Sequence, residues 1–345
     1  MESRELRWGI VGCGVIAPAH AESVARAKGA KLVAVCDIVP EKAARLAARF
    51  GQPAVYSDLK EMLQQGELDI LSVCTPSGLH GEHIEAAAEA GVHILSEKPL
   101  EITLEKMDSA IRACQEAEVK LGGVFQRRTF PTSIQIKQAL DAGELGKLLL
   151  GSAYLKYYRD QAYYDSSDWR GTWELDGGGA LMNQGVHGID LLLWFMGDVK
   201  RVFARAGTLA RDIEVEDTAV ISLEFKNGAF GIIEGTTTVY PGMDTRLEIH
   251  GEKGTIVLEE QRIKVWETLE GGSKIGTIND AKSPGISGDP SALGPLTHDV
   301  LVEDMISALK EDREPLISGA EARKAVELIL AIYESARTGK EVVLD

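Results

Sequence analysis

The sequence predicts two domains of different fold class: an N-terminal α/β domain with a doubly wound parallel sheet, then an α+β domain. Short apolar runs alternate with helical patterns over about the first 120 residues, as in parallel sheets covered on both faces. Consecutive β-rich segments follow from Val199 to Glu267. A chain of 345 residues suits about two domains, which we expect at 1–122 and 123–345, with closing helices at 298–338 that can pack back on the first.

The elements of the first domain follow from apolar runs and helix signals. Strands are expected at Leu6–Val11, Lys31–Cys36, Ile70–Val73, His93–Ser96 and Leu121–Phe125. Helices are expected from the first glycine turn to about Lys28 and at Pro40–Phe50, Asp58–Gln65, Leu79–Ala90 and Leu104–Glu118. Pro40 suits a first helical turn, and Ser57 is expected to cap the helix after it.

The second domain changes to hairpin signals. Asn227-Gly228 and the segment Gly251–Gly254 indicate tight turns between strands, which predicts an antiparallel sheet. The remaining elements expected here are helices at Pro131–Ala142 and Gly179–Met196, a strand at Leu148–Tyr158, a long loop at Gly271–Thr297, and helices at His298–Glu311 and Gly319–Thr338.

Composition excludes several classes of protein. There are 37 Lys and Arg residues against 53 Asp and Glu, a net charge of −16, so a nucleic acid is not an expected partner. No apolar run approaches the roughly 18 residues of a membrane span, and the charged N-terminus does not resemble a signal peptide, which predicts a cytoplasmic protein. The four cysteines are far apart, without the spacing of a metal or redox site.

A dinucleotide-binding turn follows the first strand. In the G-x-G-x-x-A segment, Gly12 permits the tight turn, Gly14 lets the backbone approach a pyrophosphate, and Ala17 allows close helix–strand packing. Asp37 ends the second strand and can accept both ribose hydroxyls, while Ile38 offers no arginine for a 2′-phosphate, so NAD is favoured over NADP. The cofactor-binding residues expected in the turn itself are Gly12, Cys13, Gly14, Val15 and Ile16.

Two further segments follow strands of the same sheet, at the carboxyl edge where this fold binds ligands. Thr75-Pro76 would lie along the nicotinamide half of the cofactor. Glu97-Lys98-Pro99 is expected to place a lysine near the positive nicotinamide, where partial desolvation should lower its pKa and let it exchange protons near neutrality. The alternative for Lys98 is an ordinary surface lysine in a loop.

A polar stripe lies on the predicted helix after the triple glycine at 177–179. Asn183 and His187 are spaced i,i+4, and Asp190 is about one turn further on, within an otherwise apolar helix. His187 is a candidate general base that Asp190 would orient. The alternative is a core histidine with satisfied hydrogen bonds.

The G-x-G-x-x-A turn, Glu97-Lys98-Pro99 and Gly177–Asp190, in this order and spacing, resemble the Gfo/Idh/MocA oxidoreductases over essentially the whole chain. The resemblance implies a Rossmann domain and a second domain with a large, mostly antiparallel open sheet. It also implies that Lys98 and His187 are catalytic. The residues that it adds to the cofactor site are His80, Glu97, Lys98, Gln126, Trp169 and Arg170.

One position departs from the family pattern. Many sugar and inositol dehydrogenases that the chain resembles carry Asp four residues before the histidine, where this chain has Asn183. An amide cannot take a proton, so Asn183 could only orient a hydroxyl. A similar Asn-Gln arrangement occurs in the branch of the family that acts on UDP-N-acetylglucosaminuronate, which makes nucleotide sugars a candidate substrate class.

Aromatic side chains gather between Tyr154 and Trp173, which hold seven of the 20 aromatic residues of the chain and suit stacking on sugar rings. The segment Gln126–Arg170 has seven basic and five acidic residues, which is compatible with an anionic substrate. No metal site is expected, because His80 and His83 lack a third ligand nearby in the sequence. The substrate-binding residues expected are Asn183, Asp190, Arg127, Arg159 and Tyr163.

The predicted function is NAD-dependent hydride transfer from a secondary alcohol of a sugar, cyclic polyol or sugar derivative, with Lys98 and His187 handling the proton. The alternatives are a UDP-sugar 3-dehydrogenase, a keto-sugar reductase, or a non-catalytic NAD-binding regulator on the same fold. An open sheet needs its outer face covered, so we expect a homodimer or homotetramer.

Overall fold

The computed structural model describes residues 4–274 and 298–344. The chain divides into two compact units: unit 1 takes its described residues from Met1–Gln126 and Leu293–Arg323, and unit 2 takes its own from Arg127–Ala292 and Lys324–Asp345. No helix within these described ranges is long and apolar enough to cross a membrane.

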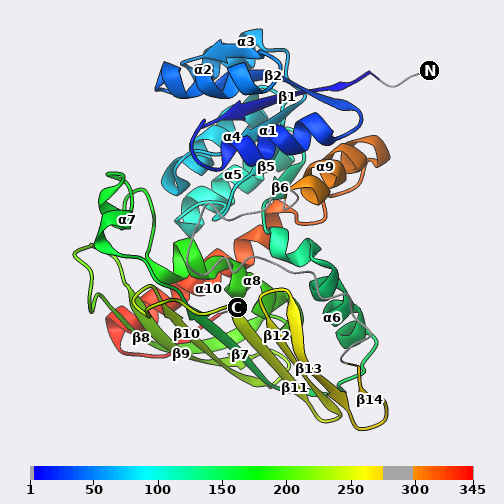
Figure 1. Ribbon diagram of the computed structural model, residues 1–345, viewed down its shortest axis with the longest axis vertical. Helices are drawn as coiled ribbons and strands as arrows, with labels where there is room; N and C mark the ends of the chain where they lie inside the picture. The colour runs from blue at the N-terminus through cyan, green and yellow to red at the C-terminus, as the bar shows by residue number, and fades with distance from the viewer. Residues whose placement is uncertain (1–3, 275–297, 345) are drawn as a thin grey trace. The chain divides into compact units, whose positions relative to one another are not determined.

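Unit 1 contains a six-stranded sheet that is parallel throughout. Its strands are β1 (Leu6–Val11), β2 (Ala30–Cys36), β3 (Ala54–Tyr56), β4 (Ile70–Val73), β5 (His93–Ser96) and β6 (Leu121–Gly123). The order β3-β2-β1-β4-β5-β6 reverses between β1 and β4 (Figure 1), and folds of this kind bind ligands at the carboxyl ends of the strands on either side of such a reversal. The predicted doubly wound sheet is therefore confirmed, and β3 is a strand that the sequence analysis did not include.

Helices cover this sheet and join its strands. Asp58, not Ser57, caps α3, since its carboxylate accepts the N–H of Glu61 at 2.9 Å. The late helix α9 packs against α1, beside which it is drawn in Figure 1, so a segment far along the chain completes this unit. The helices are α1 (Ala17–Arg26), α2 (Pro40–Arg49), α3 (Leu59–Gln65), η1 (Ser77–Leu79), α4 (His80–Glu89), α5 (Leu104–Glu116) and α9 (Asp299–Glu311).

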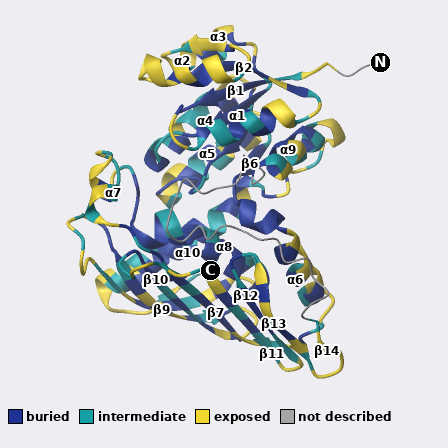
Figure 2. Ribbon diagram, in the orientation of Figure 1, coloured by how far each residue is buried: buried dark blue, intermediate teal, exposed yellow. Residues whose placement is uncertain are grey.

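Unit 2 contains a nine-stranded sheet, in the order β14-β13-β12-β11-β7-β10-β9-β8-β15. Among the described strands of this sheet only β7 and β10 pair in parallel, which confirms the mostly antiparallel sheet. Residues along the strands alternate between buried and exposed, as Figure 2 shows, because only one face carries helices. The strands are β7 (Leu148–Lys156), β8 (Val199–Gly207), β9 (Thr218–Phe225), β10 (Phe230–Thr236), β11 (Arg246–Gly251), β12 (Gly254–Glu259), β13 (Arg262–Thr268), β14 (Gly272–Ser273) and β15 (Val342–Val343).

The helix predicted at Gly179–Met196 is in fact two elements. A π-helical segment, η3 (Ala180–Gly185), leads into α8 (Val186–Met196), which packs on β7 and β11. π-Turns within helices often mark functional sites. The other helices are η2 (Gln126–Thr129), α6 (Pro131–Asp141), α7 (Gln161–Asp165) and α10 (Gly319–Thr338). Most of the predicted Gly271–Thr297 loop lies outside the described residues.

Candidate functional site

The glycine turn after β1 approaches the backbone that follows β4. Gly12 has a φ of +84°, and a Cβ on it would lie 2.6 Å from the carbonyl carbon and oxygen of Cys74. Only glycine fits both this conformation and this contact. A Cβ on Gly14 would have no atom within 4 Å, so the backbone here borders open space. That space at the start of α1 suits a pyrophosphate, and the turn fits a dinucleotide.

Asp37 is held in place at the end of β2. One carboxylate oxygen accepts the N–H of Cys13 and the other that of Val39, both at 2.8 Å. Ile38 is 90% exposed and Val15 76% exposed, so apolar side chains border the fixed carboxylate. The fixed carboxylate of Asp37 is suited to ribose hydroxyls, and Ile38 offers an apolar surface to an adenine ring, a role that was not predicted for it.

His80 joins two of the predicted cofactor loops. Its ring nitrogens lie 2.8 Å from the carbonyl oxygen of Thr75 and 2.7 Å from that of Pro99, and the residue is 1% exposed. The Thr75 hydroxyl lies 3.0 Å from Nδ1 of His83. This placement favours a positioning role for His80 over the predicted contact with cofactor, since its ring is enclosed by protein.

Glu97 lies in a buried cluster at the end of β5, next to half-buried Lys98. Its Oε1 atom is 3.0 Å from His20 Nε2 and 2.9 Å from His298 Nε2, and Oε2 accepts the N–H of Lys98 at 3.2 Å. Burial raises the pKa of Glu97, but the two histidines outweigh it and hold that pKa well below its usual range. The three residues are far apart in the sequence, and no local pattern predicts that they meet.

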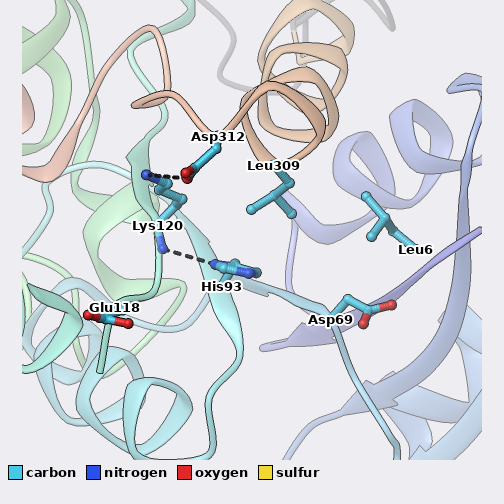
Figure 3. Close-up of a pocket in the computed structure, with 7 residues that line it drawn as sticks. All are labelled: Leu6, Asp69, His93, Glu118, Lys120, Leu309 and Asp312. Carbon is cyan, nitrogen blue, oxygen red and sulfur yellow. Dashed lines mark hydrogen bonds and ion pairs between the residues drawn. The ribbon is translucent and has the colours of Figure 1, made fainter. Parts of the chain in front are cut away.

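A pocket of about 370 Å³ lies at the opposite, amino-terminal edge of the same sheet (Figure 3). Its polar groups pair with one another: the N–H of Lys120 donates to His93 Nδ1 at 2.9 Å, and Lys120 Nζ lies 3.4 Å from Asp312. It is therefore remote from the glycine turn and from Lys98, which follow the carboxyl ends of the strands. Its lining residues are Leu6, Asp69, His93, Glu118, Lys120, Leu309 and Asp312.

In unit 2, Glu216 anchors the start of η3. Its carboxylate accepts the N–H groups of Gly179 at 2.9 Å and Leu181 at 2.8 Å, and the hydroxyl of Tyr333 at 2.9 Å. Burial raises the pKa of Glu216 to about 7, although these donors act in the opposite direction. A Cβ on Gly179 would lie 1.8 Å from the carbonyl oxygen of Glu216, so this close approach requires glycine.

Asn183 lies in η3, and His187 lies half-buried in the first turn of α8. The amide Nδ2 of Asn183 donates to Asp176 at 2.7 Å, and the other oxygen of Asp176 accepts the N–H of Gly171 at 2.9 Å. Because a carboxylate accepts only, this bond fixes the amide orientation, with the Asn183 carbonyl turned away from Asp176. Asp176 is 2% exposed and was not among the predicted site residues.

The Tyr163 side chain lies among two arginines and a glutamine. Its hydroxyl accepts from Arg170 at 2.5 Å and from Gln184 at 3.0 Å. The guanidinium of Arg170 lies 4.3 Å from the Tyr163 ring centroid and that of Arg159 lies 5.4 Å from it. Arg170 also lies 4.8 Å from the centroid of Trp169. Two predicted substrate residues, Arg159 and Tyr163, and the predicted Trp169-Arg170 pair therefore fall in one cluster, together with Gln184.

Two predicted substrate residues are ion-paired inside unit 2 instead, whereas Arg159, which is also only 6% exposed, lies against the Tyr163 ring. Asp190, 1% exposed, accepts two hydrogen bonds from Arg128, at 2.9 and 2.6 Å. Arg127 lies 3.2 Å from Glu260, and each side chain is less than a tenth exposed. Buried charges of this kind need their partners, so the placement favours structural roles over substrate contact for Arg127 and Asp190. Gln126 is also buried, at 5% exposed.

The chain was compared with known proteins. Residues 6–124 match the model of the oxidoreductase family with an NAD-binding Rossmann fold, and residues 133–257 match the GFO/IDH/MocA C-terminal domain. The WlbA dehydrogenase from Bordetella pertussis, solved in complex with NADH and UDP-GlcNAcA, is 37% identical, with 99% of each chain covered and a TM-score of 0.88.

Two other relatives extend the comparison. The WlbA dehydrogenase from Chromobacterium violaceum, solved with the same two ligands, is 34% identical with a TM-score of 0.89, covering 100% of this chain and 97% of that one. Myo-inositol 2-dehydrogenase from Thermotoga maritima is 31% identical over 74% of this chain and 76% of its own. The chain therefore belongs to the Gfo/Idh/MocA family of NAD-binding oxidoreductases.

Proposed function

We propose that this protein oxidises a secondary alcohol of a UDP-linked sugar acid, with NAD as the hydride acceptor and with Lys98 and His187 moving the hydroxyl proton. The observation that carries the substrate class is the Tyr163 cluster, in which Arg159 and Arg170 bring two positive charges to one aromatic ring. Guanidinium groups are suited to binding carboxylate and phosphate, whereas a neutral cyclic polyol offers no charge to pair with them.

The likeness to the two WlbA dehydrogenases supports this choice, because both were solved with UDP-GlcNAcA and match the chain along almost its whole length. Asn183 supports it as well. Asp176 orients the amide of Asn183, which leaves the Asn183 carbonyl to accept a hydrogen bond from a sugar hydroxyl. An amide cannot take the hydroxyl proton.

Proton transfer is assigned to the two remaining ionisable groups. His187, half-buried in the first turn of α8, acts as general base on the hydroxyl, and Lys98 polarises the same oxygen. NAD, when bound, supplies the acceptor for the hydride that leaves the carbinol carbon. In the residues described here, Gly12, Gly14 and Asp37 would hold that cofactor, and Asp37 would disfavour the 2′-phosphate of NADP.

The test is a reduction assay with NAD and with NADP across UDP-GlcNAcA, UDP-GlcNAc and myo-inositol. We expect turnover with UDP-GlcNAcA, much weaker turnover with UDP-GlcNAc because it lacks the carboxylate, and a preference for NAD. Arg170→Met should raise KM for UDP-GlcNAcA more than for UDP-GlcNAc. Equal activity on the two nucleotide sugars would contradict the role of the arginines.

A neutral cyclic polyol is the second candidate, favoured by the 31% identity with the inositol dehydrogenase. Turnover of myo-inositol in the same assay, without turnover of UDP-GlcNAcA, would establish it in place of the first. NAD binding with no turnover on either substrate would favour a non-catalytic regulator.

We further propose that the protein is a homo-oligomer that pairs through the open face of its large sheet. Phe203, Val220 and Phe230, on neighbouring strands, are 38%, 57% and 64% exposed on that face. Sedimentation should give a dimer or tetramer, and Val220→Lys should shift it toward the monomer. A monomeric wild-type protein would contradict the proposal.

A further inference from the structure

We propose that His298, Glu97 and His20 form a buried positioning network that holds the backbone of Lys98, so that His298 is a positioning residue for proton transfer. The inference rests on the proposed function, because it gives the network a purpose only if Lys98 reacts. It assigns a role to a histidine that lies 201 positions from Glu97 in the sequence.

The geometry of the network is that of one carboxylate with three donors. His20 Nε2 and His298 Nε2 share the Oε1 atom of Glu97, at 3.0 and 2.9 Å. The opposite oxygen, Oε2, accepts the backbone N–H of Lys98 at 3.2 Å. The three side chains are no more than 9% exposed, so solvent does not compete for these bonds. A change at His298 is therefore transmitted to Lys98 through a single carboxylate.

The direction of the hydrogen bonds follows from Glu97, whose carboxylate can only accept, so the proton of His20 lies on Nε2. The indole N–H of Trp8 can only donate, and it does so to Ser72 Oγ at 2.8 Å. Nδ1 of the neutral His20 ring is an acceptor, so the hydroxyl of Ser72, 2.9 Å away, donates to it. His20 thus serves as a neutral donor of fixed tautomer, and the charge of the network is concentrated on Glu97.

A metal ion is the competing interpretation, because the donor atoms of these three residues all lie within 4.8 Å of one another. A metal requires each histidine to present a lone pair to a common centre. Here the Nε2 atoms of both histidines lie at hydrogen-bond distance, 3.0 and 2.9 Å, from a single carboxylate oxygen that accepts from them. The arrangement is therefore one of donors around an anion.

The network is not needed to complete the sheet. The N–H of Glu97 already donates to Val73 at 2.9 Å, and that of Val124 donates to Ser96 at 2.9 Å, so the backbone on either side is paired. Burying a carboxylate among ring nitrogens is costly, and an apolar core would serve the fold as well. The network instead links three parts of unit 1 to one another. His20 belongs to α1, the helix after the dinucleotide turn, His298 directly precedes α9, and Glu97 directly precedes Lys98.

The test compares His298→Leu with His298→Gln in the full chain. Leucine fills similar space without a donor, whereas glutamine retains an N–H for Glu97. We expect His298→Leu to lower kcat for UDP-GlcNAcA about 10- to 100-fold, as misplaced reacting groups do, with little change in KM or in the Kd for NADH. His298→Gln should recover most of that loss.

Arg26→Gln is the matched control. Arg26 on α1 pairs with Asp299, the neighbour of His298, at 2.7 Å, so its loss loosens the contact of α1 with α9 without touching Glu97. We expect kcat of this variant to stay near wild type. A loss equal to that of His298→Leu would show that packing of α9, not the donor, is what matters, and would overturn the proposal.

Two further measurements separate this inference from the proposed function. The rate at which a lysine reagent modifies Lys98, followed by mass spectrometry, should change in His298→Leu and stay near wild type in His298→Gln, whether or not any substrate turns over. An unchanged rate in both variants would refute the positioning role even in an active enzyme. Stoichiometric zinc in the purified wild-type protein would replace the network with a metal site.

Discussion

Glu97 in unit 1 and Glu216 in unit 2 are two buried carboxylates whose pKa values are shifted in opposite directions. Glu97 is 7% exposed and accepts from two imidazoles, and its pKa lies well below the usual range. Glu216 is 4% exposed and accepts from two backbone N–H groups and a tyrosine, and its pKa rises to about 7. The two imidazole donors outweigh the cost of burial at Glu97, whereas the backbone and tyrosine donors do not outweigh it at Glu216.

The two carboxylates also occupy equivalent places in the proposed chemistry. Glu97 immediately precedes Lys98, and Glu216 holds the start of the segment that leads through Asn183 to His187. Each unit thus fixes its own reacting group with a buried acid, one charged and one close to its titration point at neutral pH. Glu97 therefore acts as a buried charge, whereas Glu216 acts mainly as a buried hydrogen-bond acceptor.

The largest loss of kcat is expected when Lys98 or His187 is replaced. Lys98→Met and His187→Asn should each lower kcat by roughly 10²- to 10⁴-fold, the usual contribution of a general acid or base. Binding of NADH, measured by fluorescence titration, should remain near wild type in His187→Asn. If both variants turned over UDP-GlcNAcA at the wild-type rate, neither acid would be next to a reacting group.

Glu97→Gln should have the next largest effect. An amide retains one acceptor but presents an N–H₂ to donors, so one of the bonds to His20, His298 or Lys98 is lost. Breaking a buried charged network costs about 3 kcal/mol or more, which urea unfolding would detect. Because the folded pKa is depressed, the stabilisation by Glu97 is present above its ordinary value of 4.5 and is lost as pH falls below it. An unfolding free energy equal to wild type would contradict the network.

Glu216→Gln should give a smaller loss with the opposite dependence on pH. The folded pKa of about 7 is above the ordinary 4.5, so the stabilisation by Glu216 is fully present below 4.5 and is lost as pH rises through 7. The variant removes this slope from the plot of unfolding free energy against pH, an effect on the order of 3 kcal/mol across the window. Glu97→Gln is its control and should retain the slope. An unchanged slope in Glu216→Gln would place the titration elsewhere.

Tyr333→Phe should give the smallest change. It removes one neutral donor from Glu216 and leaves the two backbone N–H groups in place. A loss of about 1 kcal/mol in unfolding free energy is expected, with a further small rise in the pKa of Glu216. A loss as large as that of Glu97→Gln would mean that Tyr333 is more than one of three donors.

Local features of the fold could be predicted from the sequence. The strand Leu6–Val11, the glycine turn and the carboxylate at Asp37 depend on residues close together in the chain, and β1 has the predicted bounds. Periodicity also predicted α10 at Gly319–Thr338. The π-helical start of Gly179–Met196 was not predicted, because the wider turn is set by Glu216, which binds Gly179 and Leu181 from outside the helix.

Ion pairs between residues far apart in the sequence could not be predicted from local patterns. Nothing near Arg127 or Asp190 in the sequence indicates that Glu260 and Arg128 neutralise them inside unit 2. Similarly, His298 has no neighbour that suggests a bond to Glu97. Exposed donors for a ligand and buried donors for a carboxylate have the same residue types, so only the fold distinguishes them.

Unit 1 is built from two stretches of chain, Met1–Gln126 and Leu293–Arg323, each within its described residues. During synthesis, the dinucleotide turn, Asp37 and Lys98 all leave the ribosome long before His298. Until that histidine arrives, Glu97 is a carboxylate with one of its two imidazole donors missing. The nascent chain can therefore form its cofactor turn early, but it completes the proposed network around Lys98 only when about nine-tenths of the chain has been made.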